Sequence, residues 1–294
     1  MTSARLDHIS DFDTLPRIPA WVTSARAETL EDAAFLSGAT LNHLHLVLGC
    51  REVPQALLRD RLALRAAAAC VAVSGRSERE AELRDAVHLL RPGDLPGPAG
   101  ETHLAWRRAA ERRVSVKALG RALPTFEPGQ IAAWLDAGKG VPVTRAAMVL
   151  EAVLREAPRN EVTALVLADA ALAQALGREH LVPMLAAGLK RADLRSHGDD
   201  LRLACHRALI SSAVEAVHLS ANLARRAVHL RAVAPKLRAK GAGDAVDMFL
   251  TRDAVASSAL PLPDRAARRL CDRLVELGAV RELTGRDTFR LYGV

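Results

Sequence analysis

Half of the 294 residues are hydrophobic but only 3% are aromatic, so the core must be built mainly from Ala, Leu and Val. This composition favours helices, because Ala and Leu are strong helix formers whereas sheets favour β-branched and aromatic side chains. The net charge is +7, and residues 201–294 carry all of it, with 16 Lys and Arg against 9 Asp and Glu. A basic C-terminal third suits a nucleic-acid partner. A basic surface without any polyanion partner is the alternative.

The sequence indicates neither secretion nor a membrane. Residues 1–14 have acidic side chains among their few apolar ones, unlike a signal peptide. The longest apolar run, residues 66–73, is far shorter than the roughly 20 residues needed to span a bilayer. The four cysteines form no Cys-x-x-Cys pair, so we expect reduced thiols in a cytoplasmic protein with no membrane partner.

An N-terminal arm, residues 1–28, is expected to precede a large α-helical domain, residues 29–233. Thr29 can cap the first helix of this domain, with Glu31 and Asp32 in the first turn. A loop rich in Pro and Gly, residues 91–100, interrupts the helical pattern. The spacing of apolar residues predicts helices over residues 29–48, 54–73, 77–90, 101–112, 116–122, 128–136, 143–155, 161–176 and 199–233.

A basic linker, residues 234–243, is expected to lead into a small second domain, residues 244–294. Two short helices are predicted there, at 245–250 and 253–258. A longer helix follows, with Pro263 near its start and Gly278 as its C-cap. Two β-type runs, 280–283 and 288–292, surround a Gly-containing turn and predict a hairpin. The fold class expected is mainly α: a large helical domain followed by a winged helix-turn-helix with a β-hairpin wing.

The predicted long helix has an arginine-rich face opposite its apolar face. Recognition helices enter the major groove with their N-terminal residues, and the arginines lie toward the start of this helix. The basic side chains of the turn, the second strand and the linker would contact the phosphate groups of DNA. The expected DNA-binding residues are Arg265, Arg268, Arg269 and Arg273 of the helix, Arg286 and Arg290 of the hairpin, and Lys236, Arg238 and Lys240 of the linker.

Two resemblances follow from particular segments. Residues 274–286, which read LVELGAVRELTGR, resemble the winged-helix tail of many bacterial regulators and of Fic-type proteins. Fic catalysis needs a His followed by a Gly-rich turn ending in Arg, which this sequence lacks, so adenylyl transfer is not expected. Residues 35–108 and 190–207, together with the tail, resemble an uncharacterised family known mainly from alphaproteobacteria, domain of unknown function 1403. That resemblance implies no activity.

Catalytic and metal-binding motifs are weak. There is no phosphate loop, dinucleotide fingerprint or His-Glu-x-x-His helix. Asp85, His88, Asp94 and His103 surround the Pro/Gly loop, and His88 and Asp94 are the weak candidates for a metal site. We favour the interpretation that Asp94 is a turn residue and His88 packs against the next helix. A second and weaker group consists of His197, Asp199, Asp200 and His206.

The function expected is double-stranded DNA binding, in a transcriptional regulator whose helical domain senses a small-molecule effector or forms a homodimer. One alternative is an enzymatic or ligand-binding helical domain with the winged helix as a protein-docking module. Another is a non-catalytic scaffold. No cofactor and no catalytic residue are predicted.

Overall fold

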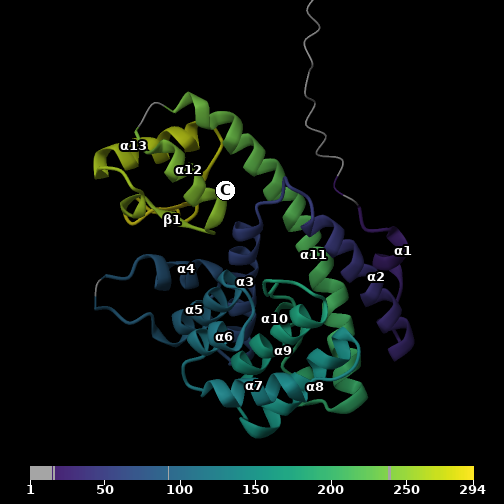
Figure 1. Ribbon diagram of the computed structural model, residues 1–294. Coiled ribbons are helices and arrows are strands. Elements are labelled where there is room, and N and C mark those ends of the chain that lie inside the picture. The colour runs from purple at the N-terminus through teal and green to yellow at the C-terminus, as the bar shows by residue number, and fades with distance from the viewer. Residues whose placement is uncertain (1–14, 16, 92, 238–239) are drawn as a thin grey trace, which may run out of the picture.

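The computed structural model describes residues 15, 17–91, 93–237 and 240–294, and Figure 1 shows their arrangement. The described chain is mainly helical, as expected, with 13 α-helices and three short strands. Because residues 1–14 and 16 are not described, most of the expected N-terminal arm (residues 1–28) lies outside the described residues. The first ten helices are α1 (Ala20–Ser24), α2 (Leu30–Leu48), α3 (Gln55–Val73), α4 (Glu80–His88), α5 (Gly97–Glu111), α6 (Val116–Ala122), α7 (Pro128–Ala137), α8 (Pro142–Glu156), α9 (Glu161–Ala175) and α10 (Leu185–Gly188).

Local capping explains where several helices begin. The Thr29 hydroxyl accepts a hydrogen bond from the Asp32 amide at 3.1 Å, and the Asp32 carboxylate accepts one from the Thr29 amide at 3.3 Å. This reciprocal pair starts α2 where the sequence predicted. The prediction for α4 was three residues early, because it begins at Glu80 and the Glu82 carboxylate caps the Arg79 amide. Pro98 lies in the first turn of α5, which therefore begins inside the predicted loop.

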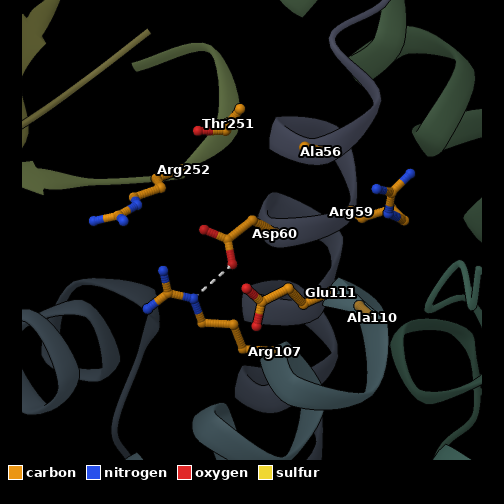
Figure 2. A pocket seen from close by; sticks show the side chains of 8 residues that line it. All are labelled: Ala56, Arg59, Asp60, Arg107, Ala110, Glu111, Thr251 and Arg252. Carbon is orange, nitrogen blue, oxygen red and sulfur yellow. Dashed lines mark ion pairs between the residues drawn. The ribbon is translucent and has the colours of Figure 1, made fainter. Parts of the chain in front are cut away.

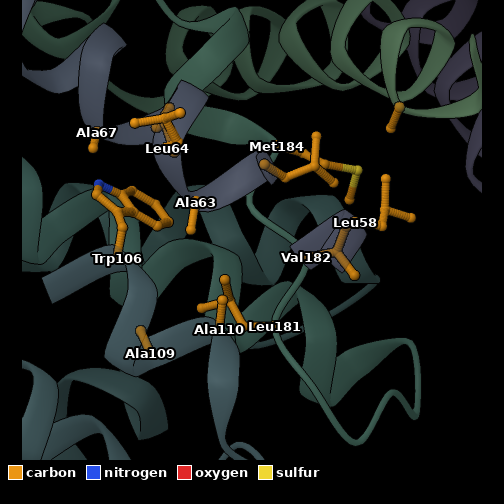
Figure 3. Close-up of a cluster of buried hydrophobic side chains, with 14 of the residues drawn as sticks. Leu58, Ala63, Leu64, Ala67, Trp106, Ala109, Ala110, Leu181, Val182 and Met184 are labelled. Carbon is orange, nitrogen blue, oxygen red and sulfur yellow. The ribbon is translucent and has the colours of Figure 1, made fainter. Parts of the chain in front are cut away.

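The helical core is formed by three main pairings, α8 with α9, α3 with α5, and α2 with α11 (Gly198–Val233). Trp106 of α5 is fully buried among small side chains such as Ala63 and Ala67, as Figure 3 shows. Its indole Nε1 donates to Cys70 Sγ at 3.3 Å. Small residues opposite one large ring allow α3 and α5 to pack closely. No helix in the described chain is both long enough and apolar enough to cross a membrane.

Helix α11 connects the helical region to the last part of the chain, and Figure 1 shows it extending alongside both. It ends at Val233, as predicted. We call residues 242–294 the C-terminal unit. It contains α12 (Ala242–Thr251), β1 (Val255–Ala256), α13 (Asp264–Glu276), β2 (Arg281–Glu282) and β3 (Leu291–Gly293).

The three strands form one antiparallel sheet with the order β1-β3-β2. Tyr292 is central, because it lies opposite Val255 on one side and Glu282 on the other. The carboxylate of Glu282 accepts hydrogen bonds from the amides of Thr284 and Gly285, which fixes the start of the loop between β2 and β3. Strand pairing there is shorter than predicted, and residues 284–290 form the loop.

The helix predicted at residues 253–258 is wrong. The chain is extended at β1 and then makes a single 3₁₀ turn, Ser257–Ala259. Pairing with β3 and the polar contacts of Asp253 with the helical region account for the difference, since both fix the backbone through partners distant in sequence.

Candidate functional site

Helix α13 separates its apolar and charged side chains on opposite faces. Its apolar face is buried within the C-terminal unit and consists of Ala267, Leu270, Cys271 and Leu274. We call the exposed side chains Arg265, Arg268, Arg269 and Arg273 the α13 arginine face.

Most arginines of the α13 arginine face form no ion pair with another described residue. In the described part of the chain, Arg265, Arg268 and Arg269 make no ion pair, whereas Arg273 pairs with Glu276 at 3.0 Å. Two further acids, Asp264 and Asp272, are exposed on the same helix. The net positive charge is therefore small and is concentrated in the first half of the helix.

A cavity of about 510 Å³ lies between α13 and the loop that joins β2 to β3. Arg268 and Asp272 line it from the helix, and Phe289 and Arg290 line it from the loop. Phe289 is 63% exposed and has φ of +56°, a left-handed backbone conformation that residues other than Gly rarely adopt. Arg290 donates from Nε to the Arg286 carbonyl at 2.8 Å, which braces the loop.

Arg286 forms an ion pair within the protein. Its guanidinium forms an ion pair with the carboxylate of Asp85 on α4, although the arginine side chain is still 52% exposed. The loop that the sequence interpreted as a wing tip therefore contacts the helical region. Of the linker cations, Lys236 and Lys240 are exposed, and Arg238 lies outside the described residues.

A buried ion network holds the C-terminal unit against α3 and α4. Asp253 is 1% exposed, and its carboxylate contacts the guanidinium groups of Arg61 and Arg84. Its amide donates to Asp60 at 2.8 Å, and Asp60 also pairs with Arg107 of α5 at 3.1 Å. Burial alone would raise the pKa of Asp253, but the charges of Arg61 and Arg84 outweigh burial and lower it.

Sequence reasoning did not identify this network. Asp253 lies 169 residues after its partner Arg84 and 193 residues after Asp60, and each of these two partners looks like an ordinary surface charge of a helix. The one local signal is that Asp253 follows a helix and precedes the two-residue strand β1.

Figure 2 shows a cavity of about 260 Å³ next to the network, between α3, α5 and the end of α12. Arg107 and Asp60 point toward each other there, and Arg252 extends on the same side of α3. Glu111 and Arg59 complete the charged lining, which therefore contains three arginines and two acidic residues. The charges are nearly balanced, and the cavity is smaller than most ligand pockets.

The group around the Pro/Gly loop does not form a metal site. Asp94 closes a turn, because its carboxylate accepts from the Arg91 amide at 3.0 Å. Burial, reinforced by the charge of Arg107, lowers the pKa of His88 to about 4. His103 is buried, with Nδ1 3.3 Å from the Leu83 carbonyl. Among the described residues, no group of three or more His, Cys, Asp or Glu side chains could hold a metal ion.

The second histidine group is dispersed. His206 Nδ1 lies 2.7 Å from the hydroxyl of Ser37 on α2, and His197 Nδ1 lies 3.7 Å from Glu151. Asp199 pairs with Arg202 one turn along α11, at 2.9 Å. The contacts of His206 and His197 link α11 and its N-terminus to other helices, and the Asp199 pair lies within α11.

Comparison with curated proteins finds no match. The model of one protein family, described as protein of unknown function (DUF1403), matches residues 6–294. This match covers the helical region, the ion network and the C-terminal unit together. The chain therefore belongs to the DUF1403 family over nearly its whole length.

Proposed function

We propose that the protein binds double-stranded DNA through its C-terminal unit, acting as a winged helix, and that it is a transcriptional regulator. The observation that carries the proposal is the α13 arginine face. Its three N-terminal arginines are exposed and have no ion-pair partner in the described chain. Guanidinium groups donate in a planar fork that suits both phosphate oxygens and the edge of guanine.

The order of elements supports the same proposal. A helix, a short strand, the arginine-bearing helix and a two-stranded hairpin follow one another, and the first strand pairs with the last. This order resembles that of a winged helix-turn-helix, except that a single 3₁₀ turn stands where such a fold has a helix before the recognition helix. Arg290 lies on the loop beside α13, where it can join a phosphate contact.

A binding assay on the full chain tests the proposal. We expect Arg268→Gln with Arg269→Gln to weaken binding to random-sequence duplex DNA by roughly 10- to 100-fold at about 0.1 M salt, because two phosphate contacts are lost. The matched control is Arg112→Gln with Arg121→Gln, which removes the same charge from exposed sites of the helical region. Fluorescence anisotropy with labelled duplex measures both. Equal affinities of the two variants would refute the proposed DNA surface.

The contact between Arg286 and Asp85 favours a second candidate function, in which the loop between β2 and β3 is a protein-docking element and not a DNA-binding wing. In that case Asp85→Ala should lower the free energy of unfolding by up to about 1 kcal/mol, because the pair is partly exposed, and should leave DNA affinity unchanged. If the loop is instead a DNA-contacting wing held on α4, the same variant should increase DNA affinity. Anisotropy and urea denaturation of the variant together separate the two functions.

A further inference from the structure

A second basic surface lies on the other side of α3 from the cavity in Figure 2. A groove of about 770 Å³ is lined by Arg61 and Arg65 of α3, Arg226 of α11 and Arg281 of β2. The four arginines therefore come from three elements, and one of them belongs to the C-terminal unit. None of these four arginines was among the predicted DNA-binding residues.

Two of the four guanidinium groups have no ion-pair partner among the described residues. Arg61 contacts Asp253, and Arg65 lies 4.0 Å from Glu215. Arg226 and Arg281 make no ion pair with any residue that the structure describes. Burial lowers the pKa of Arg226, and the nearby charges of Arg281 and Arg61 lower it further.

Such an arrangement costs free energy in the free protein, because like charges are held together in a partly desolvated groove. A bound anion would remove that cost. A basic group perturbed in this way, in a cleft that brings together several guanidinium groups, is typical of a binding site. Arg226 and Arg281 are thus unpaired within the described chain and available to a bound anion.

The size of the groove and its remaining lining limit the class of anion. Its volume falls within the range of small-ligand pockets, about 300–1,000 Å³. Asn222 adds an amide, and guanidinium pairs bind phosphate oxygens in a bidentate manner. Glu80 and Glu215 line the same groove, and their charges oppose a long polyanion lying along it. A compact phosphorylated molecule fits these features better than a nucleic-acid backbone.

We propose that this groove binds a small phosphorylated ligand, with Arg226 and Arg281 as the principal phosphate contacts. The ligand would bridge α11 and β2, so its binding would strengthen the attachment of the C-terminal unit to the helical region. The proposal does not depend on DNA binding by α13.

Inorganic pyrophosphate is the probe for the first test, with the full chain and ionic strength held constant with chloride. Isothermal titration calorimetry should detect binding, and pyrophosphate should raise the midpoint of thermal unfolding. Arg226→Gln with Arg281→Gln should weaken binding at least tenfold. Arg231→Gln, an exposed arginine of the same helix outside the groove, should bind like the unaltered protein.

The ligand-free variants supply a second readout. Arg226→Gln removes an unpaired charge, so without pyrophosphate it should unfold at the same temperature as the unaltered protein or at a higher one. Arg226→Lys with Arg281→Lys keeps the charges and should retain part of the affinity, which guards against a folding defect.

The proposal is overturned if pyrophosphate does not bind the unaltered protein at matched ionic strength, or if it binds the double glutamine variant equally well. It is also overturned if that variant loses DNA affinity while pyrophosphate has no effect, since the groove would then be a nucleic-acid surface.

Discussion

Asp253 connects the two parts of the molecule through a single buried carboxylate. Arg61 and Arg84 both pair with it, Arg84 having Glu80 as a second partner at 3.5 Å, and its own amide donates to Asp60. We expect Asp253→Asn to lower the free energy of unfolding by about 3–5 kcal/mol, because two guanidinium groups would lose their common partner. Urea denaturation measures the change. Asp136→Asn, at an exposed site, should change it by less than about 0.5 kcal/mol.

A small loss in Asp253→Asn, comparable with that of the Asp136 control, would contradict the role given to this carboxylate. It would mean that the apolar contacts between α12 and α3 hold the C-terminal unit without the ion network.

His88 predicts a dependence of stability on pH. Burial keeps it neutral in the folded chain down to about pH 4, whereas the unfolded chain protonates it near its ordinary value of 6.5. Its surroundings contain Arg107, Arg252 and His103, with Asp253 as the opposing charge. Its contribution is therefore neutral above pH 6.5 and increasingly destabilising as pH falls from 6.5 to about 4, by up to about 3 kcal/mol.

Replacing His88 with Gln should remove this contribution. The free energy of unfolding of His88→Gln, measured by urea denaturation between pH 7.5 and 4, should fall less steeply than that of the unaltered protein. Parallel curves would show that His88 is not held neutral by its environment.

At the scale of elements, close contact between α10 and α11 depends on Gly188. A Cβ at this position would lie 2.5 Å from the Ala208 carbonyl oxygen and 2.6 Å from its Cα, and backbone atoms cannot move aside as a flexible side chain can. We expect Gly188→Ala to destabilise the chain by about 3 kcal/mol in urea denaturation.

Gly129 of α7 is the matched control, since a Cβ there would meet no atom within 4 Å. Ala at this site should leave stability unchanged or raise it by up to about 1 kcal/mol, because Ala is the better helix former. Similar effects of the two substitutions would contradict the close packing of α10 on α11.

Helix positions were predictable from sequence where local signals decide them. The boundaries of α2 and the length of α11 follow from capping, breakers and periodicity, all of which act within a few residues. Residues 253–258 were not predictable, because their composition tolerates a helix and their extended form depends on β3, Arg84 and Asp60. Local propensity yields to such tertiary contacts.

The candidate site was predictable to the same extent. The exposure of Arg265, Arg268 and Arg269 follows from the amphipathic pattern of one helix. The pairing of Arg286 with Asp85 joins positions 201 residues apart, and no local pattern marks either partner. The groove around Arg226 and Arg281 likewise depends on elements distant in sequence meeting in space.

At the scale of the whole molecule, basic charge is concentrated in the last third of a family member that is otherwise neutral. Part of this charge lies on two separate surfaces: the α13 arginine face on the C-terminal unit, and Arg226 and Arg281 in the groove at its junction with α3 and α11. We infer that the first contacts DNA and that the second binds a small phosphorylated ligand.

The salt dependence of DNA binding is the most direct test of the first of these roles. Each phosphate neutralised contributes about 0.9 to the slope of log affinity against log salt. The full chain should therefore show a negative slope, shallower by about 2 in Arg268→Gln with Arg269→Gln and unchanged in Arg112→Gln with Arg121→Gln. The same slope in all three proteins, or no binding at low salt, would contradict DNA recognition by α13.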